Sequence, residues 1–185
     1  MGFHTFDSSQ AAGLEDQERF KYVSIDELLA LFDPDGESTV ADLGSGTGFY
    51  TDEIAPYVGH VYAVDVQEEM HSHYRQKGLP ENVEPVTAEV SDLPFEDDAL
   101  DGAYSTMTYH EFASEESLAE LARVCRPGAR VGIADWGGAG AGERGPPLSE
   151  RFDAAEAASA LESAGFDVDR ADDRRETFVL SARLE

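Results

Sequence analysis

The stretch "DLGSGTG" at residues 42–48 decides the fold, with "TVA" before it and "FYTDEIA" after it. Its three glycines alternate with small polar residues directly after a short apolar run. Glycine lets a backbone approach a ligand closely and adopt positive φ, and a following helix points free N–H groups at the loop. We therefore expect a strand at 39–43, a ligand-binding loop and a helix at 49–57.

The spacing of the glycines bears on which ligand the loop holds. Dinucleotide binders use G-x-G-x-x-G, but here the position of that third glycine is Phe49, which argues against a nicotinamide cofactor. Asp65 ends a second predicted strand at 60–66, where a carboxylate can accept two hydrogen bonds from a ribose diol. The pattern favours a ligand that contains adenosine. The alternative is a glycine turn with a helix-capping aspartate.

Strand and helix patterns alternate along the rest of the chain. Such alternation predicts a single domain over 1–185 with a parallel sheet covered by helices on both faces. We place the third strand at a sheet edge because it contains Pro85, and we expect "RPG" at 126–128 to end a helix. The predicted helices are 25–32, 67–77, one capped by Ser114 and one opened by Asp153 and closed near Gly165; the further predicted strands are 83–90, 99–107, 129–136, 166–171 and 177–184.

The charge of the chain is unusual. It has 39 acidic and 13 basic residues, a formal net charge of -26, and the acids are spread along its whole length. This pattern is typical of proteins of salt-loving organisms, whose self-repulsion is screened by salt; an acidic surface for a basic partner is the alternative. Without a basic patch we expect no binding to nucleic acid.

Other features of the composition indicate a cytoplasmic protein. The only cysteine, Cys125, excludes an internal disulfide framework and a multi-cysteine metal site. No apolar stretch is long enough for a membrane span, and the first residues lack the pattern of a signal peptide. We also expect no metal at His71 and His73, because residues two apart on a helix do not face each other.

At this point the sequence resembles the class I S-adenosylmethionine-dependent methyltransferases, of the methyltransferase type 11 kind. It is most similar to the small-molecule branch that includes quinone-biosynthesis C-methyltransferases, and its charge suggests a halophilic archaeon. The resemblance rests on "VADLGSGTG", "VYAVDVQEEM", "AEVSDLPFEDDALDGAYS" and "LARVCRPGARVGIADW" in this order. It implies a Rossmann-like, doubly wound, seven-stranded sheet of order 3-2-1-4-5-7-6 with the last strand antiparallel, and S-adenosylmethionine as cofactor with S-adenosylhomocysteine as product.

The resemblance also implies which residues hold the cofactor. Asp42 and Gly44 would bind its amino-acid end, and Gly46 would leave room for the ribose and sulfonium. Asp65 would bind the ribose hydroxyls and Val66 would lie beside the adenine. The remaining cofactor residues would be Gly48 in the loop, Glu89 and Val90 at the adenine, where the family often has aspartate in place of Glu89, and Ser105 at the methionine moiety.

The methyl acceptor should lie near "TYHEF" at 108–112 and "DW" at 135–136. Methyl transfer needs alignment and exclusion of water, and it needs a base only if the acceptor must lose a proton. His110 is the candidate base, with Glu111 and Asp135 as further catalytic candidates; a packing or capping histidine is the alternative. Tyr109 and Trp136 are expected to contact the substrate, unless Trp136 is simply buried under the glycine-rich loop.

Two segments are expected to close the site. The N-terminal segment 1–22, with His4, Phe6 and Arg19, is either a lid over the cofactor or a disordered tail. The glycine-rich segment 137–150 is a flexible loop next to the active site.

The function that the sequence favours is methyl transfer to a small-molecule acceptor by a monomer or homodimer. The alternatives are a non-catalytic module that binds an adenosine cofactor and, less favoured, a nicotinamide-dependent oxidoreductase.

Overall fold

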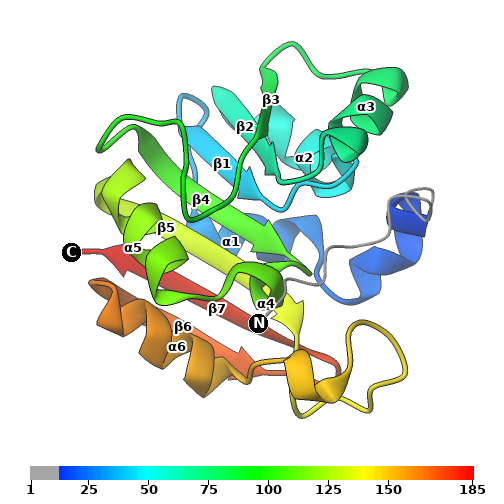
Figure 1. Ribbon diagram of the computed structural model, residues 1–185, viewed down its shortest axis with the longest axis vertical. Helices are drawn as coiled ribbons and strands as arrows, with labels where there is room; N and C mark the ends of the chain where they lie inside the picture. The colour runs from blue at the N-terminus through cyan, green and yellow to red at the C-terminus, as the bar shows by residue number, and fades with distance from the viewer. Residues whose placement is uncertain (1–12) are drawn as a thin grey trace.

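A computed structural model describes residues 13–185 as a seven-stranded sheet with helices on both faces (Figure 1). The strand order is β3-β2-β1-β4-β5-β7-β6, as expected. β1 to β5 pair in parallel, and β7 runs antiparallel to both β5 and β6. The strands are β1 (Thr39–Leu43), β2 (His60–Asp65), β3 (Val83–Thr87), β4 (Leu100–Thr106), β5 (Cys125–Trp136), β6 (Phe166–Asp173) and β7 (Thr177–Leu184).

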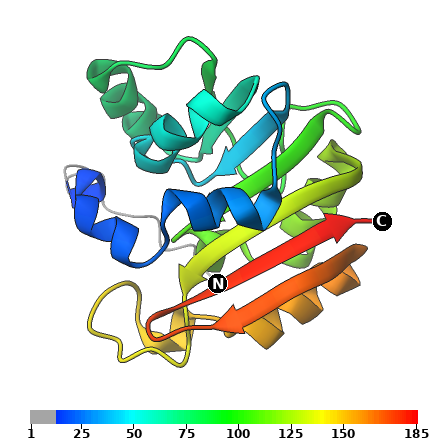
Figure 2. The same cartoon turned by 180° about the vertical axis from the view of Figure 1, so that it is seen from behind.

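The helices form two layers, one on each face of the sheet. α5 and α6 cover the face seen in Figure 1, and α1 lies on the opposite face, which Figure 2 shows. None of the described helices has the length and apolarity to cross a membrane. The helices are α1 (Ile25–Phe32), α2 (Phe49–Ile54), α3 (Glu68–Lys77), α4 (Tyr109–Phe112), α5 (Glu115–Val124) and α6 (Ala154–Ser163), with 3-10 helices η2 (Gln17–Lys21), η3 (Ala55–Tyr57) and η4 (Leu148–Glu150).

Side-chain caps fix where the predicted helices begin. The Ser24 hydroxyl accepts a hydrogen bond from the backbone N–H of Glu27 at 3.2 Å, which starts α1. Asp153 and Glu156 form a full capping box at α6, each side chain accepting from the other's backbone N–H. Each such cap satisfies N–H groups that the first helical turn leaves unpaired, typically worth about 1 kcal/mol.

The structure moves several of the predicted strand boundaries, and the two largest changes are in β5 and β3. β5 begins at Cys125 rather than at 129, because Cys125 already pairs with Leu100 before an irregularity in the β4–β5 ladder. β3 ends at Thr87 rather than at 90, and the chain turns from there toward the sheet's carboxyl edge. Pro85 does lie in an edge strand, since β3 pairs only with β2.

The core is divided by the sheet. One cluster of buried side chains joins the sheet to α5 and α6, and it includes Tyr109 and Phe178. The other joins it to α1 and α2 and includes Phe32 and Tyr104, whose rings stack at 4.9 Å. Because both faces are packed, the carboxyl ends of the strands are where a parallel sheet of this kind opens to a ligand.

Candidate functional site

A cavity of about 980 Å³ lies at the carboxyl ends of the parallel strands. That volume is near the upper end of small-molecule sites, which are roughly 300–1,000 Å³. Segments far apart in the sequence form its wall. They contribute Gly44–Gly46, Val64–Gln67, Met70, Ala88–Ser91, Thr106–Thr108, His110–Phe112, Ser117 and Trp136, and, from the two expected closing segments, residues in 13–22 and in 144–150.

Hydrogen bonds to β2 hold the glycine loop in place. The N–H groups of Gly44 and Ser45 both donate to the Val64 carbonyl at 2.9 Å. The N–H of Gly46 donates to the Asp65 carboxylate at 2.8 Å. The loop and the carboxylate therefore form one rigid unit at the cavity wall.

The three glycines of the loop have different surroundings. A Cβ on Gly46 would meet only Leu14, at 3.2 Å, so this glycine faces the cavity. Gly44 also lines the cavity, and its missing side chain makes room for Thr108. Gly48 does not line the cavity: it has φ +79° and lies under the ring of Tyr74, whose Cζ would be 2.1 Å from a Cβ. Its role is thus packing rather than the expected contact with the cofactor.

The cavity contains the residues expected at the ribose and the adenine. Asp65 accepts from the N–H groups of Gly46 and of Gln67, the latter at 2.9 Å. Burial raises the pKa of Asp65, and these two bonds oppose that effect. Val66, 45% exposed, and the pair Glu89 and Val90 line the same part of the wall.

Asp42 and Ser105 lie beneath the glycine loop and do not line the cavity, contrary to the expected direct contact. Asp42 is 1% exposed; it accepts from the Thr51 hydroxyl at 2.6 Å, and burial raises its pKa to about 7. The Ser105 hydroxyl donates to the Leu43 carbonyl at 2.8 Å and so ties the end of β4 to that of β1. Both residues support the loop from below.

The polar groups of the cavity fit S-adenosylmethionine. The buried Ser45 hydroxyl makes no hydrogen bond to the rest of residues 13–185, yet this residue lines the cavity. A buried hydroxyl without a partner is costly, so a polar ligand group there is favoured. Together with the open space at Gly46 and the carboxylate of Asp65, this arrangement suits a ligand with an amino-acid end and a ribose.

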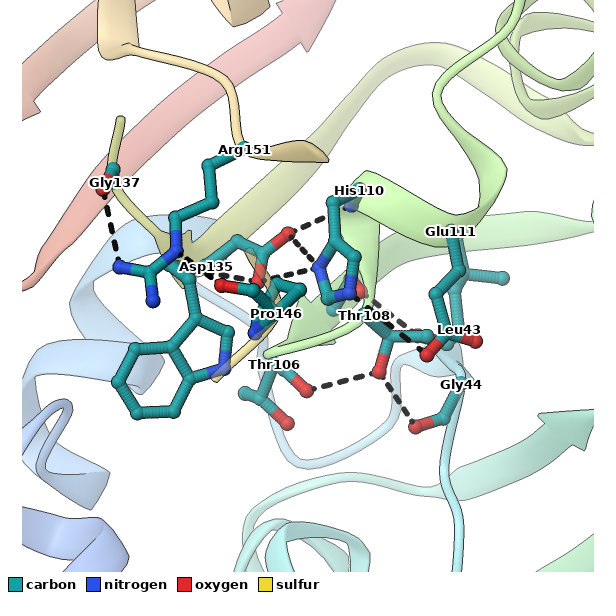
Figure 3. A network of polar contacts seen from close by, with 12 residues as sticks. Leu43, Gly44, Thr106, Thr108, His110, Glu111, Asp135, Gly137, Pro146 and Arg151 are labelled. Atoms are coloured by element: carbon teal, nitrogen blue, oxygen red, sulfur yellow. Dashed lines mark hydrogen bonds and ion pairs between the residues drawn. The ribbon is translucent and has the colours of Figure 1, made fainter. Parts of the chain in front are cut away.

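His110 and Asp135 form the central polar network of the opposite wall (Figure 3). The carboxylate of Asp135 accepts from the backbone N–H of His110 at 2.7 Å and bonds its ring Nδ1 at 2.9 Å. It also accepts from the Trp136 N–H at 2.7 Å. Asp135 is fully buried behind His110 and does not line the cavity, whereas His110 does. The expected catalytic groups are thus arranged one behind the other.

The surroundings of His110 and Glu111 raise the pKa values of both groups. Burial lowers the pKa of His110, but the hydrogen bond and charge of Asp135, with the charges of Glu111 and Glu150, outweigh it and raise the pKa above 6.5. Glu111 lines the cavity with its carboxylate 3.9 Å from Nε2 of His110. Burial raises its pKa to about 7. Two titratable groups with raised pKa values therefore lie side by side at the cavity.

Tyr109 and Trp136 differ in their access to the cavity. Tyr109 is fully buried and packs against Phe112, Phe152 and Phe178. It does not line the cavity, because α4 turns it into the core while His110 faces the opposite way. Trp136 does line the cavity, and Gly145 of the glycine-rich loop covers its ring. Trp136 therefore lies both under the loop and at the cavity wall, and its contact with a substrate stays a prediction.

Several residues of the cavity wall have contacts that were not predicted from the sequence. Tyr22 packs its ring against Trp136 at 4.8 Å. Met107 has φ +60°, an unusual value for a residue with a side chain. Arg19 lines the cavity as part of the N-terminal segment, while His4 and Phe6 lie outside the described residues. The signal in the sequence for the contribution of this segment to the cavity wall is the presence of apolar residues in the otherwise polar segment 1–22.

The histidines of α3 are far from a metal-site geometry. His71 is buried with its Nδ1 3.0 Å from the Thr87 hydroxyl, and His73 is exposed. Across residues 13–185 no cluster of three or more His, Cys, Asp or Glu side chains is placed to hold a metal ion.

Comparisons with known proteins identify methyltransferases as similar chains. The crystal structure of a SAM-dependent methyltransferase from Aquifex aeolicus is 33% identical, covers 98% of this chain and 100% of its own, and superposes with a TM-score of 0.89. A demethylmenaquinone methyltransferase of Clavibacter sepedonicus is 33% identical over 99 residues, 52% of this chain and 40% of that protein. An uncharacterized methyltransferase-like protein of Schizosaccharomyces pombe is 35% identical over 100 residues, 54% of this chain.

The curated relatives are longer than this chain, which spans 38% of the S. pombe protein. Residues 41–133 match the methyltransferase domain family. The chain therefore belongs to the methyltransferase domain family, whose SAM-dependent members share its fold and its cofactor.

Proposed function

We propose that this protein transfers the methyl group of S-adenosylmethionine to a small-molecule acceptor. The observation that carries the proposal is the hydrogen bond between the Gly46 N–H and the Asp65 carboxylate at the wall of the cavity. It unites the loop that faces the ligand with the acid that would bind its ribose. When bound, the cofactor supplies an electrophilic methyl group on sulfur, and the protein supplies alignment and exclusion of water.

The roles of the wall residues follow from their positions. Asp65 would accept hydrogen bonds from the ribose hydroxyls, with Val66, Glu89 and Val90 around the adenine. Gly44 and Gly46, with the unpaired hydroxyl of Ser45, would receive the amino-acid end. Asp42 and Ser105 would act on the cofactor only through the loop that they support.

The size of the cavity favours a small acceptor, such as those of the quinone-biosynthesis branch. Cofactor and acceptor must share about 980 Å³. The cavity lining as a whole is mostly apolar and includes Tyr22, Met107, Trp136 and Pro146. Such a wall suits a planar or apolar body better than a nucleic acid or a protein side chain on a large surface.

The segments 13–22 and 137–150 would together form a lid within this single domain. Glu18 and Arg144 form an ion pair at 3.5 Å, and the rings of Tyr22 and Trp136 are in contact. Glu15 fixes the first segment to the body of the protein through the Thr47 hydroxyl at 2.5 Å and through Lys77. Both segments line the cavity, so closing them would exclude water from the methyl group.

Ligand-induced stabilisation tests the proposed function. S-adenosylhomocysteine at 100 times its dissociation constant should add about 2.7 kcal/mol to the free energy of unfolding, and NAD should add nothing. Thermal melting with each ligand measures this stabilisation. Amide hydrogen exchange in 13–22 and 137–150 should also be slower in the complex with S-adenosylhomocysteine. Stabilisation by NAD alone would favour the oxidoreductase. Binding of the cofactor without transfer of labelled methyl groups to any acceptor in a cell extract would favour a non-catalytic module.

Salt should strongly affect stability if the protein works in the cytoplasm of a halophile, as a monomer or homodimer. A formal net charge of -26 on 185 residues is repulsive, and the screening length falls from roughly 10 Å at 0.1 M salt to roughly 3 Å at 1 M. We expect the melting temperature to fall steeply when KCl is diluted from molar concentrations. Sucrose at equal osmolarity is the control and should not replace KCl. An unchanged melting temperature would contradict a halophilic origin.

A further inference from the structure

We propose that the methyl acceptor is an apolar weak acid, such as a phenol or an enol, whose proton is taken by Nε2 of His110 while Asp135 holds the ring. The inference rests on the proposed methyltransferase activity and specifies its substrate class. It assigns Asp135 as a positioning residue, because this carboxylate contacts His110 and not the cavity.

The hydrogen bonds of Asp135 fix the tautomer of His110. A carboxylate only accepts hydrogen bonds, so Nδ1 at 2.9 Å carries a proton, and in the neutral ring Nε2 is the acceptor. The same carboxylate also accepts from the backbone N–H of His110, which fixes the residue at both ends (Figure 3). The ring is only 10% exposed and belongs to the cavity wall. Nε2 of the ring lies 3.9 Å from the carboxylate of Glu111, which also lines the cavity.

The charged groups around His110 favour its accepting a proton. Asp135 faces it from β5, Glu111 from α4 and Glu150 from η4, and all three carboxylates would stabilise an imidazolium. The cations of the cavity wall are engaged elsewhere: Arg144 pairs with Glu18, and Arg19 donates to the Leu14 carbonyl at 2.7 Å. This field would repel an acceptor that arrives as an anion. It therefore suits a neutral acid that loses its proton inside the site.

The apolar lining of the cavity restricts the rest of the acceptor. Met107, Trp136, Pro146 and Pro147 line the same cavity as His110, and Tyr22 extends the aromatic surface through its contact with Trp136. An acceptor that fits has one dissociable group and an otherwise apolar, planar body. Thioethers and tertiary amines match this site less well. They already have a free electron pair for the methyl group and no proton that His110 would need to take.

The proposed step is balanced without a further reactant. The proton of the acceptor's O–H or C–H bond moves to Nε2 of His110, and its electron pair stays on the acceptor atom. That atom forms the new bond to the methyl carbon while the carbon–sulfur bond breaks and its pair stays on sulfur. His110 then returns the proton to water.

The test uses 4-nitrophenol, a weak acid whose anion absorbs visible light, bound to the complex of the protein with S-adenosylhomocysteine. We expect the bound phenol to ionise about tenfold more readily in the wild type than in His110→Gln. In Asp135→Asn the bound phenol should ionise less readily than in the wild type. The same variant should lower the pKa of His110, which is measured by NMR of the labelled histidine ring. His73→Gln, which changes an exposed histidine on α3, is the matched control and should behave as the wild type.

The outcomes separate this inference from the proposed function. Equal ionisation in wild type and His110→Gln, or failure of the phenol to bind the complex, would overturn the inference while cofactor binding stands. A His110 pKa that does not respond to Asp135→Asn would overturn the role of Asp135. If calorimetry detects no binding of S-adenosylhomocysteine to the wild type, the proposed function itself fails. Melting temperatures of the variants show whether a loss of ionisation comes from unfolding.

Discussion

Asp65→Ala should weaken the binding of S-adenosylhomocysteine by about a hundredfold or more. In the proposed complex the carboxylate accepts two hydrogen bonds from the ribose, and bonds to a charged group contribute roughly 1.5–3 kcal/mol each. A loss of about 3 kcal/mol corresponds to about two orders of magnitude in the dissociation constant. The same substitution also removes the acceptor of the Gly46 N–H and so loosens the loop beside the ligand.

Isothermal titration calorimetry in concentrated KCl measures this effect directly. Glu84→Ala is the matched control, because Glu84 is an exposed carboxylate on the neighbouring strand β3 and is absent from the cavity wall. Asp65→Asn should lie between the two, since the amide keeps one oxygen acceptor. Wild-type affinity in folded Asp65→Ala would remove the main support for an adenosine-containing ligand at this end of the sheet.

The fold was predictable because its signals are local and repeated. The strands at 39–43 and 177–184 have the bounds that the sequence indicated, and Ser24 and Asp153 cap the helices that they were expected to open. Proline at position 85 correctly predicted an edge strand. The boundary errors lie where pairing with a neighbouring strand determines how far a strand extends. Cys125 is an example, because it joins β5 by pairing with Leu100.

The candidate site was less predictable, because burial within one short motif depends on tertiary packing. Tyr109 and His110 are adjacent in "TYHEF", and the sequence placed both at the substrate. The single turn of α4 sends Tyr109 into the core against Phe178 and leaves His110 at the cavity. In the same way Asp135 ends a strand at the right place, but its side chain is buried behind His110. Only the packed structure separates the residue that faces the ligand from the one that supports it.

The closing segments show a second kind of limit. Glu18 and Arg144 form an ion pair, and Tyr22 contacts Trp136, although each pair is far apart in the chain. Loops carry few periodic signals, so a sequence can indicate that they are long and glycine-rich but not what they contact. The sequence left open whether 1–22 is a lid or a tail, and the structure shows which residues of 13–22 line the cavity wall.

Gly48→Ala should destabilise the fold by about 2–5 kcal/mol. The residue has φ +79°, which costs an L-residue roughly 1–2 kcal/mol, and its Cβ would lie 2.1 Å from Cζ of Tyr74. Overpacking of a filled core adds about 1–3 kcal/mol. The Tyr74 hydroxyl donates to Asp52 at 2.7 Å, so the ring cannot move without losing a hydrogen bond. Chemical denaturation in concentrated KCl measures the change.

Gly46→Ala is the informative partner of that substitution, because it lies two residues away in the same loop. Gly46 also has positive φ, +55°, but the added methyl group would meet only Leu14 at 3.2 Å. We expect a smaller loss of stability, about 1 kcal/mol, together with weaker binding of S-adenosylhomocysteine, because the methyl group points into the cavity. If Gly48→Ala instead left the stability unchanged and weakened ligand binding, the third glycine of "DLGSGTG" would be a ligand contact after all. Lower stability of Gly48→Ala with unchanged ligand binding would mean that Tyr74, and not the cofactor, requires a glycine at position 48.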